Sequence, residues 1–184
     1  HGRGGNTRAA NIAAGSHVQS RHPSFVMAPA CDGRTARWVT GGFRNKDSHR
    51  NVMPELMEAI DDLVKKHSID PNRIYLTGQS MGGVGTWGII AAHPEKFAAA
   101  APVCGIWRPE DAPKMKGIPI WAFHGEKDST VPVSGSRDMI AAIKKAGGKP
   151  NYTEFPGVGH GSWEPAYAMD EFWTWLFEQS RDRR

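Results

Sequence analysis

Two kinds of hydrophobic spacing alternate along this chain. Short runs of consecutive apolar residues are typical of buried strands, and between them lie stretches whose apolar residues recur every three to four positions, as in helices. This alternation is typical of a mostly parallel sheet with helices on both faces. The predicted strands span 25–29, 73–78, 97–103, 118–123 and 151–155, and the predicted helices span about 53–67, 81–92, 133–146 and 164–179.

With 184 residues, the chain is predicted to be a single α/β domain over 1–184, long enough to bury a hydrophobic core. Its net charge of +4 comes from residues 1–50, which hold eight Lys and Arg against two acids. These basic residues are scattered and lack the interleaved aromatic residues of a groove for single-stranded nucleic acid, so we expect no nucleic-acid partner. The longest mostly apolar stretch, 97–107, is too short for a membrane helix, and we expect no membrane partner.

A G-x-S-x-G motif lies where the second predicted strand meets the following helix. It consists of Gly78, Gln79, Ser80, Met81 and Gly82. In a tight strand-to-helix turn the residues two before and two after the serine crowd each other, so both are expected to be glycine, and the serine Oγ faces the cleft above the sheet. The backbone N–H of Met81 can then stabilise an oxyanion. We predict that Ser80 is a nucleophile; the alternative is an ordinary helix-capping serine.

A carboxylate and a histidine follow this serine in an order used by serine hydrolases with open parallel sheets. Asp128 lies just beyond the fourth predicted strand, and His160 lies just beyond the fifth. The carboxyl ends of parallel strands meet at one edge of the sheet, so we expect Ser80, Asp128 and His160 to converge there as nucleophile, acid and base. Glu126 is a rival acid, and Asp128 and His160 each have the alternative of an ordinary loop residue. His124 is expected to be structural, packed beneath the acid loop.

Two other kinds of site are set aside. Gly83, Gly85 and Gly88 match the G-x-G-x-x-G pattern of dinucleotide-binding turns, but the strand ends about five residues before the first of them, and no acid lies at the end of the next strand. Close packing of the helix against the sheet explains these glycines better. The histidines show no metal-ligand spacing with a carboxylate, so we expect no metal and no cofactor.

Three segments together resemble esterases related to polyhydroxybutyrate depolymerases and bacterial feruloyl esterases, a group that includes phospholipase/carboxylesterase-like proteins labelled as predicted peptidases. The resemblance covers nearly the whole chain and implies an α/β-hydrolase fold and a serine esterase with Ser80, His160 and Asp128 as its catalytic triad. The segments are DPNRIYLTGQSMGG at 70–83, IWAFHG at 120–125 with Asp128 and Val131-Pro132, and YTEFPGVGH at 152–160 with Trp163.

The first four residues, HGRG, are similar to the H-G-x-G loop of that group, whose backbone supplies a second oxyanion donor. The resemblance assigns this donor to the N–H of Arg3, with Gly4 as the lesser alternative. In the group, a hydrophobic strand runs directly into this loop and lies at the centre of the sheet, and this chain lacks it. A gap there would leave buried backbone groups unpaired, so we expect the chain to be an N-terminally truncated form of a longer protein.

The chain has two cysteines, Cys31 and Cys104. In the sheet order of the group, two other strands separate the strands that end near them, which places those ends roughly 14 Å apart. A disulfide requires Cα atoms within roughly 7 Å, so we expect two free, buried thiols.

Only residues 105–117 separate two core elements at a place where lid domains are often inserted, so we expect no lid and an open cleft, which suits bulky or polymer-attached esters. Gln79, Trp107 and Trp163 are candidates for lining it, although each tryptophan has ordinary core or rim packing as its alternative. The expected activity is carboxylic ester hydrolysis through an acyl-enzyme, on feruloyl or acetyl groups of plant polysaccharide. A serine peptidase similar to prolyl oligopeptidases and an inactive fragment or binding module are the alternatives. A secreted or periplasmic location is slightly favoured.

Overall fold

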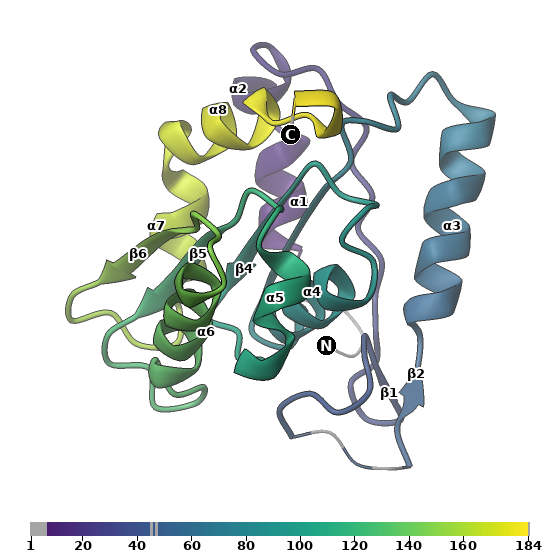
Figure 1. The fold of residues 1–184 in the computed structure, drawn as a ribbon. Coiled ribbons are helices and arrows are strands. Elements are labelled where there is room, and N and C mark those ends of the chain that lie inside the picture. Colours follow the sequence, from purple (N-terminus) through teal and green to yellow (C-terminus); the bar gives the residue numbers. More distant parts are fainter. Residues whose placement is uncertain (1–6, 45, 47, 184) are drawn as a thin grey trace.

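A computed structural model describes residues 7–44, 46 and 48–183 of the protein. Its central sheet has four parallel strands in the order β3-β4-β5-β6 (Figure 1). Because the strands are parallel, their carboxyl ends lie along one edge, with Gln79 level with Val103 and Gly125 level with Phe155. The strands are β3 (Tyr75–Gln79), β4 (Ala99–Val103), β5 (Trp121–Gly125) and β6 (Asn151–Phe155), and a separate parallel pair is formed by β1 (Ala36–Arg37) and β2 (Arg50–Asn51).

Helices cover both faces of the sheet, which confirms the predicted α/β architecture (Figure 1). One face carries α4 (Met81–Ala92), α5 (Ala112–Met115) and α6 (Ser134–Lys145), with α3 (Met53–Lys66) at the side of the molecule away from β6. The other face carries α1 (Arg8–Ala13), α2 (Ser16–Gln19), α7 (Trp163–Ala168) and α8 (Asp170–Glu178). Two short 3₁₀ turns span Pro109–Asp111 and Arg181–Arg183.

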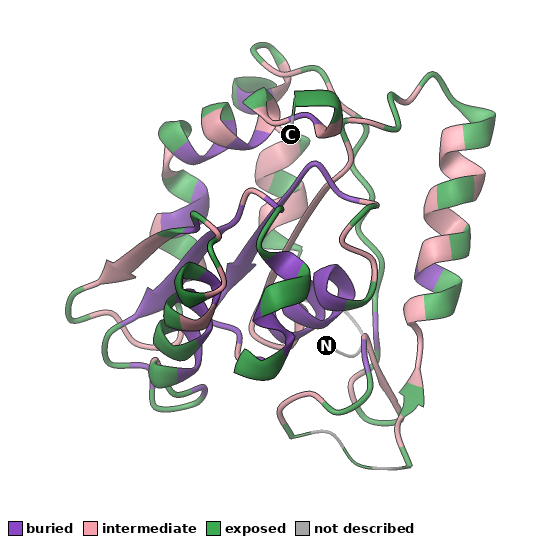
Figure 2. Cartoon of the chain, viewed as in Figure 1, coloured by how far each residue is buried: buried purple, intermediate pink, exposed green. Residues whose placement is uncertain are grey.

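The middle of the sheet and the helix that follows the nucleophile turn form the buried centre of the molecule (Figure 2). Every residue of β4 and β5 is buried, as expected for parallel strands covered on both faces. In α4 both Trp87 and Ile90 are fully buried. In α3, by contrast, only Leu56 is buried, because this helix turns one apolar stripe toward the core and the rest of its surface to solvent. The site is therefore built on the most rigidly packed elements of the chain.

The strand predicted at 25–29 is wrong. These residues belong to no strand, and Phe25 is 65% exposed. A strand is stabilised by hydrogen bonds to a neighbour, and this segment pairs with none of the described strands. The apolar run predicted a buried strand because apolar residues tend to be buried. Their composition does not show whether a neighbouring strand is present to pair with them.

The helix predicted at 164–179 is two helices. Met169 separates α7 from α8 with an extended backbone, φ −78° and ψ 117°. The next residue, Asp170, begins α8 and pairs with His17 and Arg21 near α2. The break lets α8 turn across the sheet and bury Phe172, a change of direction that apolar periodicity does not reveal.

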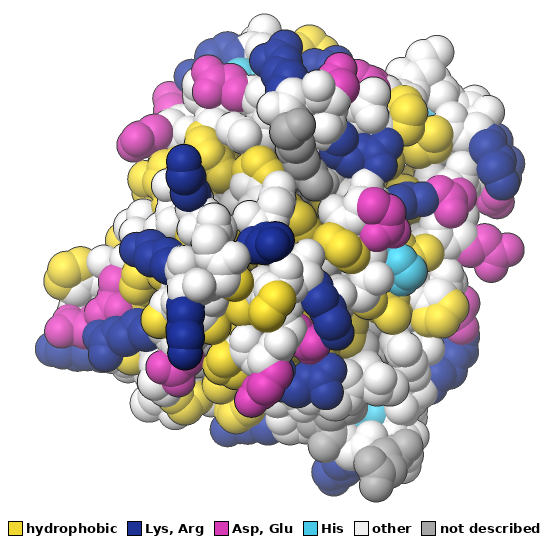
Figure 3. Space-filling view, viewed as in Figure 1, with side chains coloured by type: hydrophobic (Ala, Val, Ile, Leu, Met, Phe, Trp, Pro, Cys, Tyr) yellow, Lys and Arg dark blue, Asp and Glu magenta, His cyan; other side chains and the backbone are white. Residues whose placement is uncertain are grey.

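Basic and acidic side chains are interspersed on the face of the molecule seen in Figure 3, with apolar side chains between them. Within residues 7–44, 46 and 48–183, no helix is both long and apolar enough to cross a bilayer.

Candidate active site

The serine of the G-x-S-x-G motif lies at the turn between β3 and α4. Ser80 has φ 54° and ψ −117°, a strained conformation for a residue with a side chain and one suited to a sharp nucleophile turn. A Cβ on Gly78 would lie 2.5 Å from the Gly82 carbonyl oxygen, so the turn closes only without a side chain at that position. A Cβ on Gly82 would meet no described atom within 4 Å. The prediction that crowding requires both glycines is therefore right for Gly78 and wrong for Gly82.

Ser80, His160 and Asp128 form one line of hydrogen bonds. His160 Nε2 lies 2.8 Å from Ser80 Oγ, and His160 Nδ1 lies 2.8 Å from Asp128 Oδ2. A carboxylate only accepts hydrogen bonds, so Nδ1 carries the proton and Nε2 is left to accept the serine proton. The rival acid, Glu126, instead accepts the backbone N–H of Gly157 at 2.7 Å. This arrangement lets the imidazole act as a general base on the serine.

Three hydrogen-bond donors surround the buried carboxylate of Asp128: its Oδ1 accepts the N–H groups of Thr130 at 2.8 Å and Val131 at 2.9 Å, and its Oδ2 accepts from His160. His124 Nε2 lies 3.2 Å from the same Oδ2 and hydrogen-bonds the Val131 carbonyl at 3.0 Å. Burial alone would raise the pKa of Asp128, but the hydrogen bonds from His160, Val131 and Thr130 outweigh it and hold this pKa below its ordinary value. The carboxylate is therefore ionised at neutral pH and can stabilise an imidazolium.

A buried thiol lies directly behind Ser80. The Ser80 N–H points to the Val103 carbonyl at 3.0 Å and to Cys104 Sγ at 3.3 Å. Cys104 is fully buried, and burial raises the pKa of its thiol to about 12, so it is neutral and does not compete as a nucleophile. Cys31 is buried too, and neither cysteine is in a disulfide, which confirms the expectation.

The amide of Met81 begins α4, beside the nucleophile. The first N–H groups of a helix have no acceptor within the helix, and the first bond that closes α4 joins the Val84 N–H to the Ser80 carbonyl at 3.0 Å. The Met81 N–H is thus available to an anionic oxygen, which the positive end of the helix dipole also favours. The predicted second donor, Arg3, and its alternative Gly4 lie outside the described residues.

The sequence of this site matches one family. The model of the dienelactone hydrolase family matches residues 30–171, a range that includes Ser80, Asp128 and His160. The chain belongs to the dienelactone hydrolase family.

Relatives of this dienelactone hydrolase family member carry the names of esterases and depolymerases. Poly(3-hydroxyalkanoate) depolymerase C of Paucimonas lemoignei is 42% identical over 103 residues, which are 54% of this chain and 25% of the relative. A bifunctional acetylxylan esterase/xylanase of Neocallimastix patriciarum is 30% identical over 117 residues, which are 59% of this chain and 17% of the relative. The crystal structure of a thermostable esterase is 40% identical, with a TM-score of 0.86 over 94% of this chain and 48% of that chain.

The chain spans less than half the length of each of these three relatives. The family, the fold and the relatives together put it in an esterase group of α/β-hydrolases, which confirms the predicted resemblance.

The three candidates for lining the cleft are placed differently. Trp163, the first residue of α7, sets its indole edge-on to the His160 ring, with the ring centroids 5.3 Å apart. Gln79 is 7% exposed, and its Nε2 has no hydrogen-bond partner among the described residues. Trp107 is also 7% exposed, lies in the hydrophobic core, and donates its Nε1–H to Asp111 at 2.9 Å. Of the two tryptophans, Trp163 therefore adjoins the triad and Trp107 packs in the core.

The G-x-G-x-x-G glycines of α4 are packing positions. A Cβ on Gly83 would lie 2.3 Å from the Val103 carbonyl oxygen, so this glycine lets α4 approach β4. Cβ atoms on Gly85 and Gly88 would instead collide with indole side chains. Close helix–sheet packing therefore explains only the first glycine, and contacts with aromatic side chains explain the other two.

One group of three side chains in the described part of the chain has potential metal-ligand atoms close together. Those atoms, from Cys104, Asp128 and His160, lie within 4.8 Å of one another. The carboxylate and the imidazole are already joined by a hydrogen bond, and the thiol, with its pKa raised to about 12, resists the deprotonation that metal binding requires. The line of hydrogen bonds accounts for this proximity.

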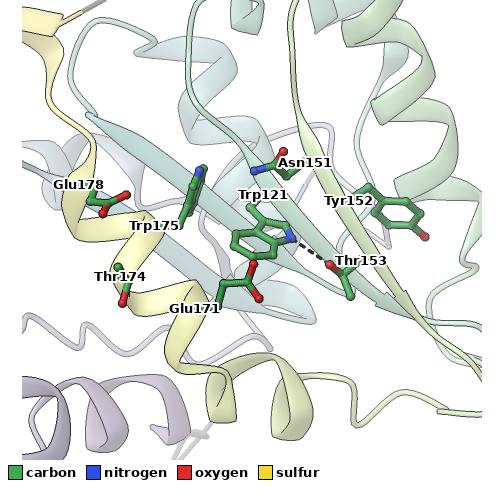
Figure 4. Close-up of a pocket in the computed structure, with 8 residues that line it drawn as sticks. All are labelled: Trp121, Asn151, Tyr152, Thr153, Glu171, Thr174, Trp175 and Glu178. Atoms are coloured by element: carbon green, nitrogen blue, oxygen red, sulfur yellow. Dashed lines mark hydrogen bonds between the residues drawn. The ribbon is translucent and has the colours of Figure 1, made fainter.

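A hollow of about 470 Å³ lies away from the triad, beside the beginnings of β5 and β6 and one side of α8 (Figure 4). The indoles of Trp121 and Trp175 and the carboxylates of Glu171 and Glu178 are among its walls. Trp121 is the first residue of β5, so it lies about 13 Å along the strand from the catalytic edge. None of the three triad residues lines this hollow.

His124, expected to be structural and packed beneath the acid loop, lies there: its Nε2 is 3.0 Å from the Val131 carbonyl and 3.2 Å from Asp128 Oδ2. Sequence reasoning did not foresee that this contact reaches the carboxylate itself. The H-G-x-x-D spacing could have indicated this contact: β5 ends at Gly125, and the turn that follows brings Asp128 back over His124.

Proposed function

We propose that this chain hydrolyses carboxylic esters through an acyl-enzyme formed on Ser80. The observation that carries the proposal is the unbroken hydrogen-bonded line from Ser80 through His160 to Asp128, built on a strained turn. The esterase names of the relatives support the same reaction class.

In the first step Ser80 Oγ attacks the ester carbonyl carbon while His160 Nε2 takes the hydroxyl proton. Asp128 stabilises the imidazolium, and the Met81 N–H stabilises the oxyanion. When the tetrahedral intermediate collapses, the bond to the alkoxy oxygen breaks and His160 returns the proton to the leaving alcohol. Water, deprotonated by the same imidazole, then attacks the acyl-enzyme and releases the acid and free Ser80.

For the substrate, we propose acetyl or feruloyl esters carried on plant polysaccharide. One relative is named an acetylxylan esterase/xylanase, and the side chain of His160 is 23% exposed, so a bulky alcohol can approach it from solvent. Trp163 offers an apolar edge beside the imidazole for the acyl group.

Replacing Ser80 with alanine tests the proposal. We expect at least about a thousandfold loss of activity on a chromogenic acetate ester, because the nucleophile is removed while binding is retained. A fluorophosphonate probe should label the parent chain at Ser80 and leave Ser80→Ala unlabelled.

A panel of acetyl, feruloyl and peptide substrates then separates the alternatives. Faster cleavage of peptides than of esters would favour a peptidase, and a parent chain that neither reacts with the probe nor cleaves any ester would refute the proposal. The ratio of acetyl to feruloyl turnover tests the substrate assignment.

A further inference from the structure

His124 is fully buried on β5, and both of its ring nitrogens have partners. Nδ1 lies 2.7 Å from Ser136 Oγ, while Nε2 lies 3.0 Å from the Val131 carbonyl oxygen and 3.2 Å from Asp128 Oδ2. Carbonyl and carboxylate oxygens only accept hydrogen bonds, so Nε2 must carry a proton.

The second ring nitrogen then follows from the charge of the ring. Burial lowers the pKa of His124, outweighing the opposite effects of the Val131 carbonyl and Asp128, so the ring is neutral at neutral pH and Nδ1 is an acceptor. Ser136 therefore gives its hydroxyl proton to Nδ1 at 2.7 Å in preference to the Gly105 carbonyl at 3.2 Å. The serine on α6 thus adds a donor at Nδ1 that stabilises the tautomer required by the two acceptors at Nε2.

We propose that His124 is a positioning residue for the triad: its Nε2–H holds Asp128 Oδ2 in line with His160, and Ser136 keeps His124 in the required tautomer. This inference rests on the proposed function. One oxygen of Asp128 then faces two imidazole rings: it accepts the Nδ1 proton of His160 at 2.8 Å, and it lies 3.2 Å from Nε2 of His124, whose proton it shares with the Val131 carbonyl at 3.0 Å. A chain of polar contacts thus leads from Ser80 through the core to Ser136 on α6.

The donor on His124 affects both the orientation and the basicity of the acid. Without it, Asp128 keeps the N–H groups of Thr130 and Val131 at Oδ1 but loses a contact that holds Oδ2 in place, so the carboxylate is less well aligned with His160 Nδ1. Oδ2 also carries more charge, which stabilises the imidazolium form of His160 and moves the loss of activity on the acid side to higher pH. Two other ionisable groups lie near these rings: Glu154, beside His124 in the β5–β6 register, and the neutral Cys104 thiol. His124 is only the smallest of the influences that lower the pKa of Glu154, well behind the hydrogen bonds from Arg137 and Tyr152, so Glu154 stays ionised when position 124 is changed.

The test compares three variants. His124→Phe keeps the ring and removes both nitrogens, His124→Gln keeps an N–H donor near the Nε2 position, and Ser136→Ala removes the tautomer lock. For each, kcat and the pH dependence of kcat/KM on a chromogenic acetate ester are measured from about pH 4.5 to 9, and rates are normalised to active sites counted with a fluorophosphonate.

The acid midpoint is the pH at which kcat/KM falls to half of its maximum on the acid side. We expect His124→Phe to lower kcat about tenfold and to raise the acid midpoint by about half a pH unit. His124→Gln should stay within about threefold of the parent in kcat, with an unshifted acid midpoint, and Ser136→Ala should raise the acid midpoint by less than His124→Phe does. A loss of packing alone would reduce the number of active sites and leave the midpoint where it was.

An unshifted midpoint in His124→Phe, or a His124→Gln variant as impaired as His124→Phe, overturns the inference. If His124→Phe shows no melting transition and is therefore unfolded, Ser136→Ala becomes the test, and an unshifted acid midpoint in that variant also overturns the inference. The proposed function fails separately, through a Ser80→Ala variant that retains activity.

Discussion

Replacing Gly78 with alanine tests how far the catalytic line depends on the closure of the nucleophile turn. The added Cβ would lie 2.5 Å from the Gly82 carbonyl oxygen, about 0.9 Å short of the 3.4 Å at which ordinary contact begins. Both groups are backbone, so neither can rotate away as a flexible side chain would. The start of α4 must therefore move away from the end of β3, and Ser80 lies between them.

The size of the effect follows from that displacement. If Ser80 Oγ moves by about 0.9 Å from its place 2.8 Å from His160 Nε2, the gap can widen to about 3.7 Å, beyond a hydrogen bond. A misplacement of about 1 Å costs about a hundredfold in rate. Overpacking of a tight site costs about 2 kcal/mol, which in a chain of this length lowers the melting temperature by about 4–8 °C.

The assay measures kcat on a chromogenic acetate ester and the melting temperature of the same preparation. Gly82→Ala is the matched stability control, because its Cβ, two residues after the serine, would meet no atom of another described segment within 4 Å, and it should melt no lower than the parent. Gly117→Ala, remote from the site and equally unobstructed, should change neither quantity. A Gly78→Ala variant with parental activity and melting temperature would refute the reasoning, as would a Gly82→Ala variant destabilised to the same degree.

Three further outcomes are expected. Asp128→Asn should lower kcat about ten-thousandfold, by analogy with serine proteases, because an amide no longer holds the histidine tautomer; a loss under tenfold in the ester assay would contradict this. Hydrogen bonding to Arg137 lowers the pKa of Glu154 to about 2, so its ionised form stabilises the fold above the unfolded pKa near 4.3, and that contribution is lost as pH falls toward 2. The melting temperature of Glu154→Gln should therefore fall less than that of the parent between pH 5 and pH 2.5, and an equal fall would count against the assignment. Cys31 and Cys104 are buried, so a thiol reagent should react slowly with the native chain and titrate both thiols in denaturant without a reductant, whereas two fast-reacting native thiols would show that the fold leaves them open.

The sequence alone determined the parts of this protein that depend on local pattern. The predicted strands match β3, β4, β5 and β6 to within a few residues. Of these, β4 and β5 are apolar runs because a strand buried on both faces has little room for polar side chains. The motif around Ser80, together with an acid and a histidine placed after later strands, predicted three side chains that the structure brings into one hydrogen-bonded line. The rule behind that success is simple: parallel strands end at the same edge, so residues just beyond them meet.

Tertiary structure decided everything that depends on a partner distant in the sequence. The run at 25–29 has the composition of a strand but no neighbour to bond, and the single helix predicted at 164–179 breaks at Met169 so that its second half can pack across the sheet. Trp107 packs in the core while Trp163 adjoins His160, a distinction that hydrophobicity cannot make. The sequence placed His124 beneath the acid loop, but only the fold brought its Nε2 to 3.2 Å from Asp128 Oδ2, because side-chain burial and contact geometry arise from the packing of several elements.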